Sequence, residues 1–414
     1  MHHRASPRAA LARVSPLRRG SEALMGLAKR STSASLEAWL QNAWSHRGWW
    51  AHATWPLSKV LWWAHCAFEH LACSTSRTFK TTPSSPTRLP VPLLVVGNVF
   101  VGGVGKTPIV ISLVEHLKAN GLQVGVIARG HGSDLKGVHV LNEQSVATQF
   151  GDEPVLIQHR TQVPVVVGVD RLRAAQVLLE RFPQTEIIVS DDGLQRLKRW
   201  ADWVVCVFDE RGLGNGWTLP AGPLREPWPR KPAGEDQAWV MVSQDPSLDP
   251  AQRPHPKPVI ALHGKRFVAE RRLGLVARNA SGQTLELKSL IEPSPRTHLA
   301  RSPRQAALVA VAGIAKPGQF FDMLSDLGLS LTARLGASDH ASAQELMALL
   351  HDELANTEKP LTVLCTEKDA SKLWSVFPQA WSVALEVRLE PLFLKEFDLA
   401  WRHRISSKHG HETH

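Results

Sequence analysis

Residues 95–108 constrain the fold more than any other part of the chain, because they join an apolar run to a glycine-rich turn that ends in Lys106 and Thr107. Their sequence is VVGNVFVGGVGKTP. A glycine-rich turn that opens a helix lets successive backbone N–H groups point at one anion, and the positive end of the helix dipole adds to the attraction. In such a loop the lysine reaches the β- and γ-phosphates of a nucleotide, and the next hydroxyl ligates Mg²⁺. The stretch therefore predicts a strand, a phosphate-binding loop and a helix, in that order.

Two known forms of this loop each differ from the sequence at one position. The G-x-x-x-x-G-K-[ST] form needs glycine where Phe100 stands, and the G-G-x-G-K-T form of partitioning-type ATPases has lysine where this chain has Val101. A glycine-rich turn that binds nothing is the alternative, but it has no need of lysine and threonine directly after the third glycine. We therefore expect ATP to contact the residues of this loop, which are Phe100, Val101, Gly102, Gly103, Val104, Gly105, Lys106 and Thr107.

Length, charge and cysteine content narrow the class of protein. The 414 residues suffice for two domains, and the 48 Lys and Arg against 38 Asp and Glu give a net charge of +10. Such a charge suits a partner that carries phosphates, whether a nucleotide, a nucleic acid or an anionic lipid surface. The four cysteines show no zinc-ligand spacing, which favours reduced thiols in a cytosolic compartment. No apolar run reaches the roughly 18 residues of a membrane span.

Apolar runs alternate with helical patterns after residue 83, which predicts an α/β fold. We expect a P-loop NTPase-type parallel sheet flanked by helices over residues 83–255 and a second, smaller α/β domain over residues 256–405. The proline-rich stretch 220–258 marks the boundary. Strands are expected at 91–96, 123–128, 163–168, 186–190, 203–208, 259–262, 273–277, 306–312 and 361–365, and helices at 107–120, 153–160, 171–182, 317–327 and 341–354.

The two ends of the chain are interpreted separately. Residues 1–34 are rich in Arg, Ser and Ala and have no apolar periodicity, so we expect a disordered leader. Their composition resembles an organelle-targeting segment, but a misassigned start codon, with Met25 as the true initiator, is the favoured interpretation. Residues 406–414 are expected to form a tail.

Residues 35–80 hold an unusual share of the aromatic side chains, with seven of the fifteen tryptophans between positions 39 and 63. Apolar residues from Leu57 to Leu71 follow helical spacing, which predicts an amphipathic helix. Such a helix either packs on the core of the protein or lies in a membrane surface, where indole rings meet the headgroups. The residues alone weigh these two interpretations evenly.

Residues 187–192, with the sequence IIVSDD, indicate a buried strand that ends in two acids. In P-loop enzymes an acid at this place holds Mg²⁺ directly or through water. Either Asp191 or Asp192 can be the nearer ligand, and a strand end that caps a helix is the alternative.

Three further groups have ordinary structural interpretations. Asp152, in the turn GDEP before a predicted helix, is favoured as an N-cap, and so is the pair Asp339 and His340 before another helix. Residues 212–227 form a loop rich in glycine and proline, of a kind that often shapes a site. Its Arg225 can bind a phosphate or form a surface ion pair with Glu226 that contributes little.

Taken together and in order, a series of blocks resembles the tetraacyldisaccharide 4'-kinase family, the lipid A kinases of Gram-negative bacteria. The resemblance runs from about residue 37 to 400, and it is the number and order of the blocks that are specific. The blocks are 96–108, 128–132 (ARGHG), 151–154 (GDEP), 164–168 (PVVVG) with Asp170 and Arg171, 191–195 (DDGLQ), 212–227, 312–314 (AGI), 339–340 (DH) and 366–370 (TEKDA).

The resemblance implies roles that the residues alone do not. Asp152 is implied as the base toward a sugar hydroxyl, assisted by His340 from the second domain, and Lys106, Arg225 and Glu226 complete the catalytic set. A base shared between two domains would assemble the site on closure and limit wasteful ATP hydrolysis. Mg²⁺ is assigned to Thr107, Asp191 and Asp192, and contacts with the sugar substrate to Asn98, Arg129 and Gln195.

The implied reaction transfers the γ-phosphate of ATP to the 4'-hydroxyl of a tetraacylated glucosamine disaccharide 1-phosphate. That acceptor resides in a membrane. The resemblance therefore favours the membrane-surface interpretation of the N-terminal helix over packing on the core, and implies a monotopic protein on the cytosolic face of the bacterial inner membrane. It implies no nucleic-acid partner and leaves the oligomeric state open.

The sequence departs from the family pattern at His131, where tyrosine is usual, and at Arg196, where histidine is usual. A P-loop switch ATPase acting on a protein partner is the alternative function. A GTPase is disfavoured because residues 366–369 place lysine and aspartate side by side, which is the wrong spacing for a guanine reader. A nucleic-acid-binding module is disfavoured because residues 36–78 hold too few Lys and Arg among their tryptophans.

Overall fold

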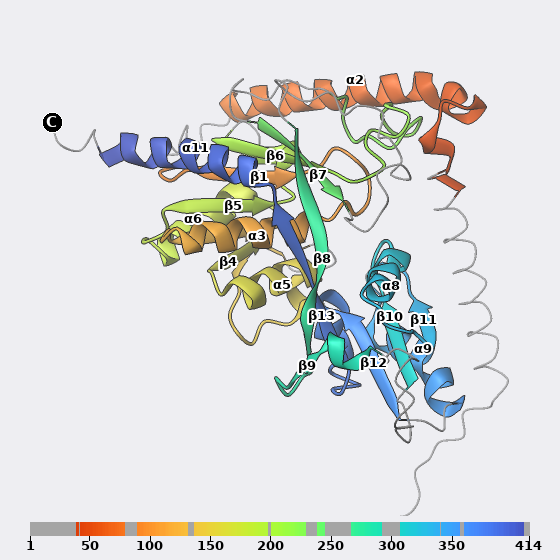
Figure 1. Cartoon of the computed structure of the whole chain (residues 1–414). Helices are drawn as coiled ribbons and strands as arrows, with labels where there is room; N and C mark the ends of the chain where they lie inside the picture. The colour runs from red at the N-terminus through yellow and green to blue at the C-terminus, as the bar shows by residue number, and fades with distance from the viewer. Residues whose placement is uncertain are drawn as a thin grey trace, which may run out of the picture.

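The computed structural model describes residues 39–40, 42–78, 89–130, 136–197, 200–228, 238–244, 266–291, 307–339, 341–356 and 360–409 (Figure 1). The predicted leader at 1–34, the strand at 259–262 and His340 lie outside these residues.

Among the described residues, thirteen strands form one mixed sheet. Neighbouring strands are parallel except for the pairs β3/β4, β8/β13 and β8/β9. In spatial order the strands are β11 (Ala333–Gly336), β10 (Ala307–Ala312), β12 (Leu361–Thr366), β13 (Trp381–Leu389), β8 (Arg266–Arg278), β7 (Ala238–Gln244), β6 (Trp203–Phe208), β1 (Leu93–Gly97), β5 (Ile187–Asp191), β2 (Val124–Ala128), β4 (Val165–Gly168) and β3 (Val138–Val140), while β9 (Thr284–Glu286) pairs with β8.

Helices occupy most of the connections between these strands. They are α2 (Trp49–Thr78), α3 (Lys106–Ala119), α4 (Ala147–Phe150), α5 (Asp152–Thr161), α6 (Arg171–Arg181), α7 (Leu194–Leu197), α8 (Pro317–Asp326), α9 (Ala343–Asn356), α10 (Glu367–Leu373) and α11 (Pro391–His409), with a 3₁₀ turn η2 at Leu287–Leu290. The expectation of a mostly parallel sheet with helices is therefore confirmed. No helix of the described residues has the length and apolarity that crossing a membrane requires.

Strands β3, β4, β2, β5, β1, β6 and β7 form the N-terminal half of the sheet. The apolar runs of β1, β2, β5 and β6 are buried along their whole length, as expected for parallel strands covered on both faces. Right-handed crossovers place α3 and α5 on one face and α6 on the other, because β1 and β2 are followed by strands to one side and β4 by a strand to the opposite side. Close packing on the second face requires glycine, since a Cβ at Gly125 would meet Leu178 of α6.

Strands β11, β10 and β12 form the C-terminal half. Phe320, Phe321 and Leu324 of α8 pack in one core beside these strands. Leu346 and Leu350 of α9 pack in a separate core with α10. This half is thus a group of parallel strands with helices that continues the same sheet.

Two long strands join the halves into one sheet. The start of β8 pairs in parallel with β7, and most of its length pairs antiparallel with β13 (Figure 1). The sequence did not predict β7, because it lies within the proline-rich stretch 220–258 that was interpreted as a boundary.

The last helix, α11, packs back on the N-terminal half. Phe393, Phe397 and Trp401 recur at helical spacing and are buried in the same core as β1. The rings of Phe393 and Phe397 lie edge-on to that of Trp239 in β7. The domain division expected from sequence counts residues 391–405 with the second domain, whereas this aromatic stripe joins them to the first core.

Candidate active site

The glycine-rich loop connects β1 to α3 and is shaped by its own side chains. Gly102 and Gly105 have φ angles of 95° and 78°, a region that favours glycine. The buried Asn98 donates a hydrogen bond from Nδ2 to the carbonyl of Phe100 at 2.7 Å and accepts one from Lys106 Nζ at 3.2 Å. Asn98, which was expected to contact the sugar, therefore lies inside the loop and holds Lys106.

The loop rests on the glycine- and proline-rich segment 212–227. The amide of Val101 donates to the carbonyl of Pro223 at 2.9 Å, and the amide of Arg225 donates to the carbonyl of Val99 at 2.7 Å. Arg211, which sequence reasoning missed, donates to the carbonyl of Gly103 at 2.8 Å. The segment 212–227, together with Arg211, thus supports the glycine-rich loop from outside.

The two predicted aspartates end β5 directly beside β1, where Val96 is in register with Asp191. Asp192 has a φ of 52°, and its carboxylate lies 3.3 Å from Lys106 Nζ and 3.7 Å from a terminal nitrogen of Arg225. Burial acts to raise the pKa of Asp192, but Lys106 and Arg225 outweigh it and hold the pKa below its usual value. Asp192 is therefore a carboxylate paired with two cations.

Asp191 has the opposite environment. Its side chain is buried, and its Oδ1 finds no hydrogen-bond partner among the described residues. Burial, followed by the nearby charge of Glu153, raises the pKa of Asp191 to about 8. A buried carboxylate left without compensation is costly, and a cation would remove that cost.

The residues present fit a Mg²⁺ ion. Thr107, in the first turn of α3, and Asp191 supply oxygen ligands of the type that Mg²⁺ takes from protein, the rest coming from water and substrate phosphates. No group of three or more His, Cys, Asp or Glu side chains with metal-binding geometry occurs among the described residues.

Gln195, Glu226 and Arg129 are the remaining predicted residues of the N-terminal half. Gln195 donates from Nε2 to the carbonyl of Asn98 at 2.9 Å and lies 3.5 Å from Glu226 Oε1. Arg129 is exposed just after β2. Arg171, which had no predicted role, is buried and donates to the carbonyl of Asp192 at 3.2 Å. Its only sequence signal was its place beside Asp170 in one of the matching blocks.

Asp152 is the first residue of α5, and Gly151 occupies the cap position. The capping interpretation of Asp152 is therefore wrong. Its carboxylate instead lies 2.9 Å from Nζ of Lys372, a residue of α10 that the sequence did not single out. Asp152 thus belongs to the contact between the two halves of the sheet.

Asp339 does not cap α9 either. Lys368 Nζ lies 2.8 Å from its carboxylate. Ser342 and Glu345 form the cap, since the amide of each donates to the side chain of the other. The structure leaves the predicted assistance of Asp152 by His340 open, because residue 340 lies outside the described ranges.

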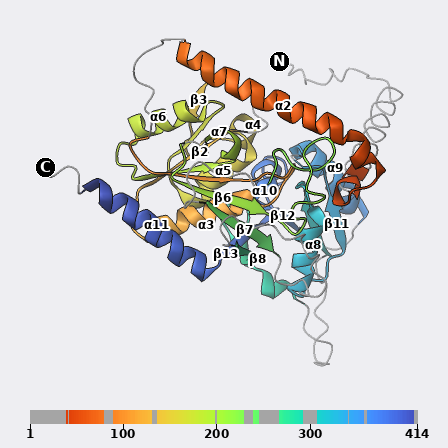
Figure 2. The same cartoon turned by 90° about the horizontal axis from the view of Figure 1, so that it is seen from above.

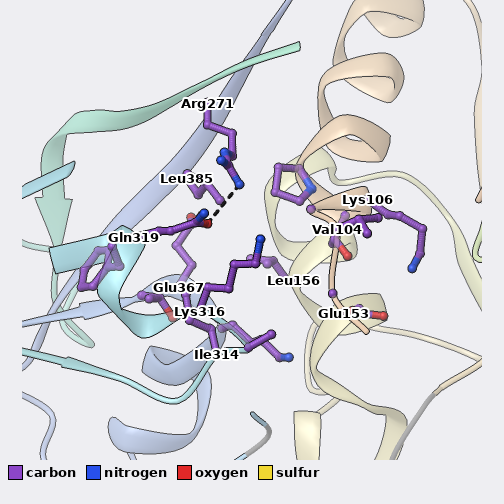
Figure 3. Close-up of a pocket in the computed structure, with 18 of the residues that line it drawn as sticks. Val104, Lys106, Glu153, Leu156, Arg271, Ile314, Lys316, Gln319, Glu367 and Leu385 are labelled. Carbon is purple, nitrogen blue, oxygen red and sulfur yellow. Dashed lines mark hydrogen bonds between the residues drawn. The ribbon is translucent and has the colours of Figure 1, made fainter. Parts of the chain in front are cut away.

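A cavity of about 210 Å³ lies between the glycine-rich loop and the C-terminal half (Figure 3). One wall consists of residues 103–108 with Glu153, and the opposite wall includes Lys316, Gln319 and Glu367. Figure 3 shows Lys106 and Lys316 on the two opposite sides. The second wall is fixed by ion pairs, since Lys316 Nζ lies 2.9 Å from Asp209 and 2.6 Å from Glu210 of the N-terminal half.

Replacing Asp191 by asparagine is expected to stabilise the nucleotide-free protein increasingly as the pH rises. The pKa of Asp191 is about 8 in the folded state and 3.8 ordinarily. Between these two pH values the folded protein holds a proton that the unfolded chain has released. The stability that Asp191 contributes is complete below pH 3.8 and is lost by about pH 8, with an upper limit of about 1.4 kcal/mol per pH unit. The amide of Asp191→Asn does not titrate, so the free energy of unfolding of this variant does not fall with pH at this position.

Urea unfolding in EDTA, at about pH 5 and about pH 8.5, measures the difference. A gain in the free energy of unfolding that is equal at both pH values would contradict the assigned environment of Asp191.

The fold and this site define an α/β protein with a glycine-rich loop and paired aspartates beside a cleft between two halves of one sheet. Residues 57–401 match the sequence model of the tetraacyldisaccharide-1-P 4'-kinase family. The chain belongs to that family.

Relatives and a solved structure agree with this assignment. The chain is 38% identical to the tetraacyldisaccharide 4'-kinase of Acidovorax sp. (strain JS42), over 89% of this chain and 96% of the relative. It is 38% identical to that of Polaromonas naphthalenivorans (strain CJ2), over 90% and 98%. A crystal structure of LpxK from Aquifex aeolicus in complex with ATP has the same fold, with a TM-score of 0.61 and 23% identity over 86% of this chain and 99% of that chain. These relatives are kinases, so they do not favour the switch ATPase.

Proposed function

We propose that this chain is an ATP-dependent lipid kinase that phosphorylates the 4'-hydroxyl of a tetraacylated glucosamine disaccharide 1-phosphate, a late step of lipid A biosynthesis. Family membership over residues 57–401 is the observation that carries the proposal. The site supports it, because Asp192 lies 3.3 Å from Lys106 of the glycine-rich loop, Asp191 ends the neighbouring strand, and Glu153 lines the cleft beside that loop. These are the parts that phosphoryl transfer to a hydroxyl requires.

The residues of the N-terminal half hold the nucleotide. Backbone N–H groups of the loop and the start of α3 receive the phosphates, and Lys106 is held toward them by Asn98 and Asp192. Thr107 and Asp191 would hold Mg²⁺, which neutralises charge on the phosphate oxygens when bound. Arg225, tied to Asp192 at the edge of the site, adds positive charge where the transferred group moves.

Asp152 is the proposed base. It accepts the proton of the sugar hydroxyl as that oxygen attacks the γ-phosphorus, while the bond from this phosphorus to the bridging oxygen breaks and ADP leaves. Its position at the contact between the two halves lets the C-terminal half contribute to the site, and we assign the assisting role to His340. Gln195 lies 3.5 Å from Glu226 and donates to the carbonyl of Asn98 at the glycine-rich loop, so we assign both residues to the lining of the site.

The test uses purified protein, ATP, Mg²⁺ and the disaccharide 1-phosphate lipid in detergent, with ³²P-labelled nucleotide. Transfer of label to the lipid is expected, and label released only as inorganic phosphate would contradict a kinase. A parallel reaction with a lipid whose 4'-hydroxyl is already blocked identifies the acceptor position.

We assign the protein to the cytosolic surface of the inner membrane, and the exposed side chains of helix α2 support this location. Its packed side carries Ala51 and Ser58, and Ser58 Oγ donates to the carbonyl of Thr218 at 3.0 Å. By the 3.6-residue period of a helix, Val60 and Trp63 lie on the opposite side, where they are 63% and 74% exposed. The helix thus turns apolar side chains outward, as an interfacial helix does. Figures 1 and 2 show it along the outside of the molecule.

The attachment of α2 connects this surface to the site. Ser58 also accepts a hydrogen bond from the amide of Ala221 at 3.0 Å, and Trp44 Nε1 donates to the carbonyl of Pro220 at 3.0 Å. The same segment, 212–227, supports the glycine-rich loop. A lipid acceptor that stays in the membrane would therefore meet the site next to the helix that binds the surface.

The double variant Val60→Ser/Trp63→Ser is expected to bind anionic lipid vesicles about tenfold more weakly or worse, because two apolar side chains no longer enter the interface. Vesicle sedimentation measures the binding. The double variant Val169→Ser/Val376→Ser, which changes exposed apolar residues elsewhere, is the matched control and should bind as wild type. Equal binding by both variants would remove α2 from the membrane contact.

A further inference from the structure

A buried ion pair joins the proposed base to the other half of the sheet. Lys372 Nζ in α10 lies 2.9 Å from Asp152 Oδ2 in α5, and each side chain is only 7% exposed. Residues 152 and 372 are far apart in the sequence. They meet because α5 of the N-terminal half packs against α10 of the C-terminal half. A residue of the C-terminal half, Lys372, therefore holds the carboxylate of Asp152 in the N-terminal half.

The ion pair is not explained by docking of the two helices alone. Burying two charges removes their hydration, and the attraction between them often does no more than offset that cost. The same helices are already joined by Arg160 and Glu367, 2.8 Å apart. A second, more deeply buried pair fits a requirement to hold one carboxylate in a defined place.

The N-terminus of helix α10 is held by hydrogen bonds, and the helix also contacts Asp339, which precedes the predicted catalytic residue His340. Thr366 caps it by accepting from the amide of Asp369, and the carboxylate of Asp369 accepts from the amide of Gly313 at 3.0 Å, at the end of β10. Lys368 pairs with Asp339, the neighbour of the predicted His340. One short helix thus contacts both Asp152 and residue 339.

We propose that Lys372 is a positioning residue for phosphoryl transfer, which holds the carboxylate of Asp152 in place for the sugar hydroxyl when the two halves are docked. This inference rests on the proposed function, in which Asp152 is the base. Lys372 acts only through Asp152 and contacts neither the nucleotide nor the lipid. Its loss therefore lowers kcat and leaves nucleotide binding unchanged.

The test compares Lys372→Gln with Arg160→Gln in the lipid kinase assay. A displaced base is expected to lower kcat about 100-fold, with KM for ATP within about threefold of wild type. Arg160→Gln breaks the other ion pair between the same two helices and should change kcat by less than about threefold. If the two variants lose activity equally, the effect is one of helix docking and the positioning role is overturned.

A double-mutant cycle with Asp152→Asn separates this inference from the proposed function. Lys372→Gln should have no further effect on residual activity once the carboxylate is gone, whereas additive losses would show that the lysine acts elsewhere. If Asp152→Asn keeps full transfer, the proposed base is wrong. If it loses transfer while Lys372→Gln keeps it, only the positioning role fails.

Should Lys372→Gln fail to fold, Lys372→Arg decides the question. Its planar head keeps the positive charge but cannot place a nitrogen at the same point, so kcat should fall about tenfold with the melting temperature retained. A kcat within about twofold of wild type would then overturn the positioning role.

Discussion

Lys106→Ala lowers kcat/KM for lipid phosphorylation by about 10³-fold or more, since removing a preorganised donor from a transferring group costs at least that when the donor also carries a full charge. The ammonium is held in the loop by Asn98 and lies 3.3 Å from Asp192, and alanine leaves no positive charge at that point. The measurement is transfer of label from ATP to the disaccharide lipid.

The control for this variant is Lys395→Ala, which removes an exposed lysine of α11 and should leave kcat/KM unchanged. Retention of a tenth or more of wild-type activity by Lys106→Ala would place the nucleotide phosphates outside the glycine-rich loop. Thermal unfolding of both variants checks that the fold is intact.

Asp152→Asn is expected to lower kcat about 10³-fold, within the range for loss of a general base, while ATP binds with nearly unchanged affinity. The asparagine has the shape of the aspartate but cannot take the proton of the sugar hydroxyl. Single-turnover transfer and equilibrium binding of ATP together measure the two effects.

Asp170→Asn is the matched control, because Asp170 caps α6 by accepting from the amide of Arg173, and asparagine caps a helix equally well. Its kcat should be that of wild type. Full transfer by Asp152→Asn would show that Asp152 is not the base, and that its ion pair with Lys372 serves only to join the two halves of the sheet.

The glycine-rich loop and the paired aspartates could be predicted because each lies in one continuous stretch of sequence. In both, an apolar strand is followed at once by the residues that carry the chemistry, and the end of one parallel strand is brought beside the end of the next. The register between Val96 and Asp191 supplies that contact. The opposite environments of Asp191 and Asp192 were not predictable, because they depend on Glu153, Lys106 and Arg225 from three other segments.

Two ordinary interpretations of acidic residues failed for a shared reason. Asp152 and Asp339 each precede a helix, and the local pattern favours capping for both. Each instead pairs with a lysine of α10, a helix distant from both in sequence. A local pattern describes the backbone groups within reach of a side chain, but it contains no information about a cation that arrives from another element.

Local sequence was thus sufficient for the strand, the loop and the start of α3, for the alternation that builds a parallel sheet, and for the helical spacing in α2, because each of these depends on neighbours a few residues away. Long-range packing settled the rest. It placed the aromatic stripe of α11 on the first core, turned Val60 and Trp63 outward, and set Lys372 against Asp152. Each of these outcomes depends on contacts between segments that are far apart in the sequence, so no local pattern of residues specifies them.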